Sequence, residues 1–335
     1  MVFLNSTKSR VFLSVFVAFI FLTFFIPTAN AYTTILNKTG GLFVRKLMRK
    51  GLIKEGVIPL DKSWIIRMGV LDLLRGYNNT IDFLEIHQDE LGDDLKALLR
   101  ALYSWNSKKP IDVGESGTLY RFLKFASWKL ELNKTFVLHK TLKQRHICDK
   151  REIVNYPLKD LLKLDNRTSQ WASASVLLGN EEKIDNPPFK LKLTYGAVSH
   201  WKMSREKGLC WKPRYDETIL RQVEAFVELL KIGKTSFVPQ QAEDYCFARV
   251  FGLITKEEGK NRWPSLCGHE SDRIEEMELE LQKANDGLDI DSKDHRVVQA
   301  IAMLFKLKNK PINFKYPQSV SKSWPQFWTF LNSEL

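Results

Sequence analysis

The chain has 335 residues, of which 44% are hydrophobic and 12% aromatic, so it is long and apolar enough for a globular protein of two domains. This composition excludes a disordered or low-complexity chain. The net charge at pH 7 is +12, and residues 1–60 supply +7 of it, because eight Lys or Arg stand there against the single acid Glu55. There is no zinc-finger spacing, RNP-like aromatic pattern or Arg/Lys run, so we expect small anionic ligands or a membrane surface rather than nucleic acid.

The N-terminal residues 1–31 have the order of a secretory signal. Lys8 and Arg10 precede the apolar run VFLSVFVAFIFLTFFI, and Ala29 and Ala31 fit a cleavage site. Two other interpretations remain open: the segment anchors the protein in a membrane, or the assigned start codon lies too far upstream.

Four cysteines are widely spaced and form no CxxC pair, so we expect reduced, mostly buried thiols and neither a metal site nor a disulfide framework. They are Cys148, Cys210, Cys246 and Cys267.

Along the rest of the chain, helical periodicity alternates with short β-like runs, which predicts an α/β protein. Helices are expected at 65–76, 92–105, 117–129, 157–164, 168–178, 215–231, 241–253, 270–284, 294–306 and 323–333. The β-like runs are 135–140, 189–194 and 311–316, and a division into two lobes is expected between 180 and 235.

The stretch GESGTLYRFL, residues 114–123, places small residues directly before an amphipathic helix with Arg121 one turn in. Small residues let a backbone approach a ligand closely, and the unpaired NH groups of a helix N-terminus favour an anion. The alternative is an ordinary turn and helix cap.

Further groups suited to anions recur at the predicted ends of helices. They are Lys62, Ser63 and Arg67 in KSWIIR, Arg145 in RH, Thr168, Ser169 and Gln170 in TSQ, His269, Glu270 and Arg273 in HESDR, His295 and Arg296 in DHR, and Lys322 in SKSWPQFW. Taken singly, each could be a helix cap, a solvated charge or a core residue with satisfied hydrogen bonds.

Taken in order, these motifs resemble the enolpyruvyl transferase family, in the form of the EPSP synthases (3-phosphoshikimate 1-carboxyvinyltransferases). The resemblance runs from Lys62 to the C-terminus. It implies a two-domain inside-out α/β barrel of βαβαββ units with the active site between the domains. It also implies transfer of the enolpyruvyl group of phosphoenolpyruvate to the 5-hydroxyl of shikimate 3-phosphate, with release of phosphate. No cofactor is implied, and we expect a monomer in the cytoplasm, although the apolar N-terminus leaves export or anchoring open.

The resemblance also assigns roles by position. Lys62, Ser63 and Arg67 would hold the shikimate carboxylate, and Thr168, Ser169 and Gln170 its phosphate and ring. Gly117, Thr118, Arg145, Arg273, Arg296 and Lys322 would form the phosphoenolpyruvate site, with Gln170 and His295 near it. Glu270 would transfer the proton to C3, beside His269 and Lys62.

The chain departs from the family pattern at several places. His269 replaces a lysine, and Glu115 replaces an asparagine near the anion site. Gln240 or Gln241 stands where the family has an aspartate base, with Glu243 or Asp244 as possible substitutes. The chain is also shorter between Gln170 and His269, by about one βαβαββ unit. Two alternatives follow: a homologue that binds a phosphorylated ligand without catalysis, or a secreted or membrane-anchored structural protein.

Overall fold

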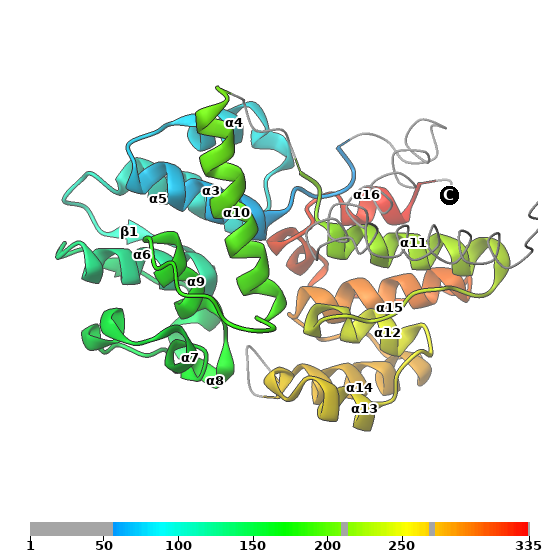
Figure 1. Cartoon of the computed structure of the whole chain (residues 1–335). Coiled ribbons are helices and arrows are strands. Elements are labelled where there is room, and N and C mark those ends of the chain that lie inside the picture. Colours follow the sequence, from blue (N-terminus) through cyan, green and yellow to red (C-terminus); the bar gives the residue numbers. More distant parts are fainter. Residues whose placement is uncertain (1–55, 209–213, 268–271, 334–335) are drawn as a thin grey trace, which may run out of the picture.

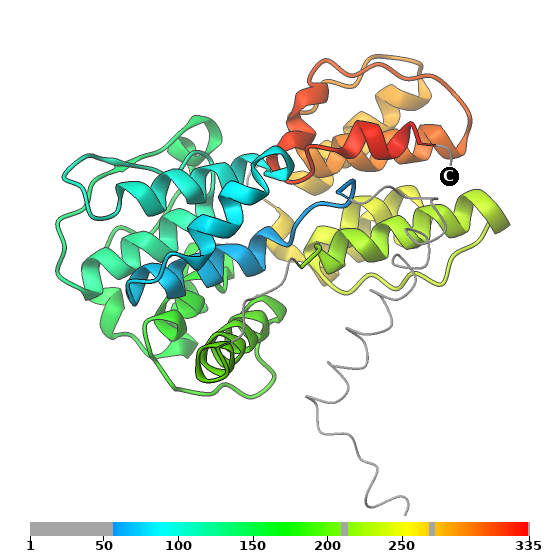
Figure 2. The same cartoon turned by 90° about the horizontal axis from the view of Figure 1, so that it is seen from above.

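The computed structural model describes residues 56–208, 214–267 and 272–333, apart from the side chains of residues 166 and 167. These residues are mostly helical and form two lobes that lie side by side (Figures 1 and 2). The first lobe contains α3 (Lys62–Leu74), α4 (Asn79–Ile86), α5 (Asp93–Ser104), β1 (Ile111–Asp112), α6 (Gly117–Lys129), β2 (Phe136–Val137), α7 (Leu158–Leu161), α8 (Leu164–Arg167), α9 (Gln170–Leu177) and α10 (Phe189–Glu206). The second lobe contains α11 (Glu217–Ile232), α12 (Tyr245–Val250), α13 (Lys256–Arg262), α14 (Arg273–Asn285), α15 (His295–Leu307) and α16 (Phe327–Leu331).

Each lobe has its own hydrophobic core. In the first lobe, α6 and α10 both pack on α9, and side chains such as Phe122 and Trp171 are fully buried. In the second lobe, α12, α14 and the 3-10 turn Pro317–Lys322 pack on α15, around the buried Trp324. Trp324 donates its indole NH to the Val57 carbonyl at 2.7 Å, so the start of the described chain belongs to the second lobe.

The chain therefore crosses between the lobes twice, and the two crossover segments pair with each other. Leu60 and Tyr215 form an antiparallel bridge. Asp61 N donates to the Arg214 carbonyl at 2.7 Å, and Asp216 N donates to the Pro59 carbonyl at 3.0 Å. This pairing fixes the relative position of the two lobes at one point.

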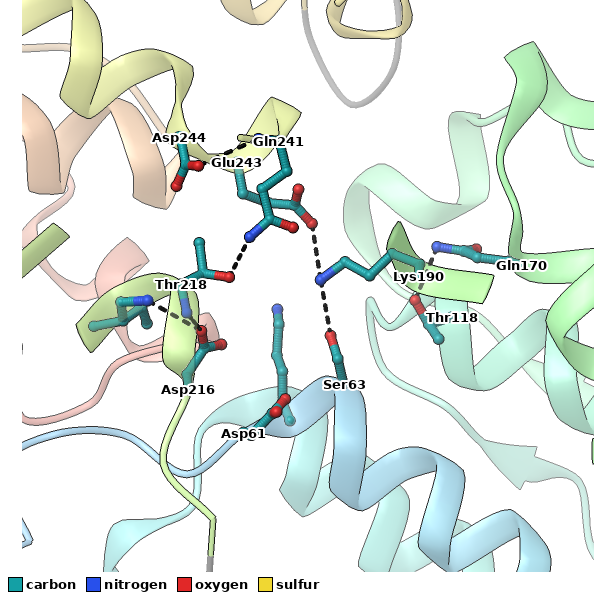
Figure 3. Close-up of polar contacts among 12 residues, drawn as sticks. Asp61, Ser63, Thr118, Gln170, Lys190, Asp216, Thr218, Gln241, Glu243 and Asp244 are labelled. Carbon is teal, nitrogen blue, oxygen red and sulfur yellow. Dashed lines mark hydrogen bonds and ion pairs between the residues drawn. The ribbon is translucent and has the colours of Figure 1, made fainter. Parts of the chain in front are cut away.

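A helix begins directly after each crossover, and an aspartate caps it. Asp61 Oδ1 accepts from Trp64 N at the start of α3. Asp216 Oδ1 accepts from the NH groups of Thr218 and Ile219 at the start of α11. An aspartate in this position satisfies NH groups that have no partner within the helix and favours the helix dipole. The starts of α3 and α11 both border the polar space into which Lys190 reaches (Figure 3).

The sheet is much smaller than the sequence suggested. β1 and β2 pair in parallel, with Ile111 opposite Phe136, and the bridges Ile290–Phe314 and Leu60–Tyr215 are isolated. Within the described residues the protein is a helical one with a two-stranded parallel sheet, and these residues form no barrel.

The largest error of secondary structure is at 189–194, where a strand was predicted and α10 forms instead. The alternation in FKLKLT is the start of a longer pattern, in which Leu191, Thr194, Ala197 and Trp201 are buried at helical spacing. Six residues are too few to separate the two periods. The helix α13 was also missed, although its capping box of Thr255 and Glu258 is a sequence signal.

Most of the other predicted elements exist with shifted ends. The helix predicted at 117–129 has those bounds, whereas the one predicted at 157–164 forms only over α7, with α8 beginning at its last residue. The run 135–140 contributes only β2, and 311–316 only the bridge at Phe314. The helix α4 was not predicted.

Asp72 ties three helices of the first lobe together. Its buried carboxylate accepts from Thr80 N at 3.0 Å, Thr80 Oγ1 at 2.7 Å, Trp201 Nε1 at 2.8 Å and Arg205 Nη2 at 3.0 Å. We expect Asp72→Ala to lower the free energy of unfolding by about 3 kcal/mol, because it leaves buried donors without an acceptor. Urea denaturation measures this loss. The exposed Asp185 serves as the control, and Asp185→Ala should change stability by less than about 0.5 kcal/mol.

Candidate anion site between the lobes

A cavity of about 260 Å³ lies between the lobes, and both lobes contribute to its walls. Every predicted site residue that the structure describes lines it. These are Lys62, Ser63, Arg67, Gly117, Thr118, Arg145, Thr168, Ser169, Gln170, Arg273, His295, Arg296 and Lys322. His269 and Glu270 lie outside the described residues.

The first turns of α3 form one wall. Lys62 and Ser63 follow the capping residue Asp61, and the ammonium of Lys62 pairs with Asp94 Oδ2 at 2.7 Å. This ion pair holds Lys62 at the cavity edge even without a ligand.

Arg67, one turn further along α3, is 1% exposed. Its guanidinium donates to Thr194 Oγ1 at 2.7 Å and to the carbonyls of Ser63 at 2.6 Å and Lys190 at 3.1 Å. Burial lowers its pKa to about 10, so it remains charged at neutral pH. Three of its donors are already used, so Arg67 mainly supports the wall and adds positive potential.

The small residues at the start of α6 allow two guanidinium groups to approach the backbone. A Cβ atom on Gly117 would lie 2.9 Å from Arg145 Nη1 and 3.0 Å from Arg121 Nη1. Gly114, three residues earlier, has φ +57°, a backbone region that glycine adopts without strain. Glycine at 117 therefore makes room both for Arg145, which lines the cavity, and for Arg121 behind it.

Arg121 fixes this region from behind. It is buried and donates Nε to Asp165 Oδ2 at 2.6 Å and Nη1 to Gln170 Oε1 at 2.8 Å. Gln170 Nε2 donates in turn to Thr118 Oγ1 at 2.9 Å (Figure 3). The sequence places Arg121 one turn into this helix but does not mark Asp165, whose partner lies 44 positions away.

Thr168 and Ser169 line the cavity at the N-terminus of α9. Ser169 is the N-cap residue, and its side chain makes no capping hydrogen bond. Two hydroxyl residues therefore line the cavity at the N-terminus of a helix, an arrangement suited to an oxyanion.

The second lobe contributes cations at the starts of α14 and α15. Arg273 Nε pairs with Asp294 Oδ2 at 2.8 Å, and Asp294 Oδ1 caps α15 by accepting from Arg296 N at 2.8 Å. Arg296 Nη1 lies 3.4 Å from Gln222 Oε1. His295 is 5% exposed and Lys322 ends a 3-10 turn; both line the cavity. One aspartate therefore orients two cationic elements.

Other residues of the protein offset the negative charge of Glu115. Its carboxylate pairs with Lys140 at 2.9 Å and accepts from Thr141 Oγ1 at 3.2 Å. The negative charge that the sequence placed near the anion site is therefore offset by a lysine outside the cavity.

Of the four candidates for the family's aspartate, only Glu243 lines the cavity. Gln240 is exposed, and the buried Gln241 donates to Thr218. Asp244 is fully buried and accepts from Arg221 at 3.0 Å and Gln222 at 2.9 Å on the side of α11. Sequence alone could not distinguish these neighbours, because their facing depends on the 3-10 turn Ala242–Asp244.

Glu243 pairs with a residue that sequence reasoning missed. Lys190 Nζ, from the first turn of α10, lies 3.1 Å from Glu243 Oε1 and 3.3 Å from Ser63 Oγ (Figure 3). Burial would raise the pKa of the Glu243 carboxyl, but the charges of Lys190 and Arg296 outweigh it and lower the pKa to about 2. Lys190 was overlooked because residues 189–194 were taken for a strand.

The cavity walls are positive overall. The lining cations are Lys62, Arg67, Arg145, Lys190, Arg273, Arg296 and Lys322, and the lining carboxylates are Asp94, Glu115, Asp216 and Glu243. Glu115 is further neutralised by Lys140. A concave site of one sign attracts ligands of the opposite sign, so the geometry favours an anion with more than one negative charge.

Three comparisons with known proteins produced no match: no family model, no curated protein and no solved structure corresponds to this chain. The part of the chain that the structure describes contains no helix with the length and apolar character needed to span a bilayer. Nor does that part contain a group of three His, Cys, Asp or Glu side chains that could hold a metal ion.

A methyl group at position 117 should displace Arg145. Arg121 is fixed by Asp165 and Gln170, so Arg145 must move. We expect Gly117→Ala to weaken phosphate binding, measured by calorimetry, about tenfold, the loss of one charge-assisted contact. The control is Gly196→Ala in α10, where a Cβ atom would meet only Trp64 at 3.9 Å. It should bind phosphate like the wild type, and equal affinity in both variants would contradict the assigned role of Gly117.

The crossover makes stability depend on pH. Burial raises the pKa of Asp61 from 3.8 to about 6, and the charge of Asp216 adds to this, while Arg214 lowers it. The folded state therefore holds the proton more tightly than the unfolded chain, so Asp61 contributes stability below pH 4 that is lost as the pH rises through 6. An asparagine caps a helix about as well and does not ionise.

We expect the free energy of unfolding of Asp61→Asn, relative to wild type, to rise by roughly 2 kcal/mol between pH 4 and pH 7. Urea denaturation of both proteins at several pH values measures the difference. A difference independent of pH would show that Asp61 has the same pKa in the folded and unfolded states.

Proposed function

We propose that the protein transfers the enolpyruvyl group of phosphoenolpyruvate to the 5-hydroxyl of shikimate 3-phosphate and releases phosphate. The observation that supports this proposal is the cavity between the lobes. Side chains from motifs spread between Lys62 and Lys322 converge there, in the set that the resemblance to EPSP synthases implies.

The physical requirements of that reaction agree with the cavity. Two polyanions must lie side by side, so cations and helix N-termini have to offset their repulsion before any bond forms. Ser63, Thr168 and Ser169 lie at the starts of α3 and α9 for one ligand. Arg145 and Arg273 come from different lobes and suit the other. In the proposed reaction the hydroxyl oxygen adds to C2 and gives up its proton to a base while Glu270 protonates C3. Loss of phosphate from C2 and of a proton from C3 then restores the double bond.

We further propose that the two lobes correspond to the halves of the family's inside-out α/β barrel, with a reduced number of βαβαββ units. The paired crossover segments and the capped helices that follow them support this correspondence. The substrates are metabolites, so we propose that the protein works in the cytoplasm and as a monomer.

A second candidate function is binding of a phosphorylated ligand without catalysis. It is favoured by the state of the one carboxylate that could replace the family's base. The pKa of Glu243, lowered to about 2 by Lys190 and Arg296 against the effect of burial, makes it a weak proton acceptor as long as the ion pair persists.

The deciding experiment measures phosphate release by the purified full-length protein with phosphoenolpyruvate and shikimate 3-phosphate, together and each alone. The proposed transferase releases phosphate only with both. Arg145→Ala and Arg273→Ala should each weaken phosphoenolpyruvate binding by at least about a hundredfold, because each removes a charged contact. The exposed Arg151 provides the control, and Arg151→Ala should bind normally.

Binding of either ligand without release would support the second candidate and overturn the first. Unchanged phosphoenolpyruvate binding in both Arg145→Ala and Arg273→Ala would contradict both candidates at this site.

A further inference from the structure

The ion pair between Lys190 and Glu243, here the cross-lobe pair, spans the cavity. Lys190 belongs to α10 of the first lobe and Glu243 to the 3-10 turn before α12 of the second. The two side chains are each 29% exposed, and both line the cavity. This contact therefore occupies part of the space that a ligand would fill.

Lys190 stands where an anion would be bound best. Its ammonium lies 3.3 Å from Ser63 Oγ, at the N-terminus of α3, and it is itself on the first turn of α10. The N-terminus of α3, a hydroxyl and an ammonium lie together there. An anion at this point must compete with Glu243 for Lys190.

We propose that the cross-lobe pair is exchanged when ligand binds: Lys190 pairs with an anionic group of the ligand, and Glu243 accepts a hydrogen bond from a ligand hydroxyl.

The ligand needs a hydroxyl group because Glu243 keeps its negative charge when Lys190 leaves it. A carboxylate that loses its cation partner beside a bound anion is repelled by it and lacks a donor. A ligand that is only an anion leaves this repulsion in place, whereas a hydroxylated anion supplies the missing donor. Lys190 and Glu243 thus select hydroxylated oxyanions over simple ones. The inference depends on the proposed function only for the identity of that ligand.

Calorimetry with inorganic phosphate tests the exchange. Glu243→Gln removes the competitor, so phosphate should bind about tenfold more tightly, while Lys190→Met should bind it at least about tenfold more weakly. The double variant should bind phosphate at least about tenfold more weakly than Glu243→Gln, because it lacks the ammonium with which the anion pairs. The control is the pair Lys256–Glu275 at 2.7 Å, outside the cavity, where Lys256→Met and Glu275→Gln should leave phosphate affinity unchanged.

The affinity for shikimate 3-phosphate tests whether Glu243 accepts a hydrogen bond from a ligand hydroxyl. Relative to phosphate, its affinity should fall about tenfold or more in Glu243→Gln, because a charge-assisted hydrogen bond becomes a neutral one. The exchange is overturned if Glu243→Gln does not tighten phosphate binding, if Lys190→Met binds phosphate as well as wild type does, or if no variant binds it. The hydroxyl assignment is overturned if Glu243→Gln changes both affinities equally.

These outcomes separate this inference from the proposed function. If the phosphate results are as expected but the protein shows no turnover, the exchange stands and the ligand is another hydroxylated oxyanion. If turnover occurs while Glu243→Gln leaves phosphate affinity unchanged, the function stands and the exchange is wrong.

Discussion

The antiparallel pairing of the two crossover segments is the constraint on which the rest of the structure depends. Two backbone hydrogen bonds, between Asp61 and Arg214 and between Asp216 and Pro59, hold the lobes together at one point. Because a capped helix begins directly after each segment, the pairing also decides where the N-termini of α3 and α11 lie. The cavity between the lobes follows from this arrangement. A buried aspartate caps each helix start, and burial together with the charge of Asp216 raises the pKa of Asp61.

Without partners of opposite charge, the cations that line the cavity would repel one another. The structure meets this cost with carboxylates placed beside the cations: Asp94 for Lys62, Glu243 for Lys190 and Asp294 for Arg273. Each pair comes from segments far apart in the sequence, so each also ties two elements together. The partners reduce the net charge of the walls while the cations remain at the cavity, which is what a site for an anion requires before its ligand arrives.

The sequence predicted the parts of the site that depend on local chemistry. Each of these parts is recognisable within a short stretch of the sequence. They are the small residues before α6, the hydroxyls at the start of α9 and the cations at the starts of α14 and α15. It did not predict Asp165, which is recognisable only once distant segments meet, and it left Glu243 and Asp244 as alternatives, of which only Glu243 lines the cavity. The strand predicted at 189–194 failed for a related reason: Leu191 and Leu193 alternate like a strand, and only the buried Ala197 and Trp201 beyond them show the helical period. That one error also hid Lys190.

Glu243 and Asp244 are adjacent carboxylates, and which of them faces the cavity decides the chemistry of this site. Both are carboxylates in the same 3-10 turn, yet Asp244 accepts hydrogen bonds from Gln240 and Gln241 and is fully buried, while Glu243 reaches the cavity. The bonds to Asp244 fix the turn, and the fixed turn directs Glu243 toward Lys190. A carboxylate held in this way by an ammonium stays charged down to low pH and is a poor base. It becomes a better one only when the ammonium is drawn away, so an anionic ligand that attracts Lys190 would also prepare Glu243 to accept a proton.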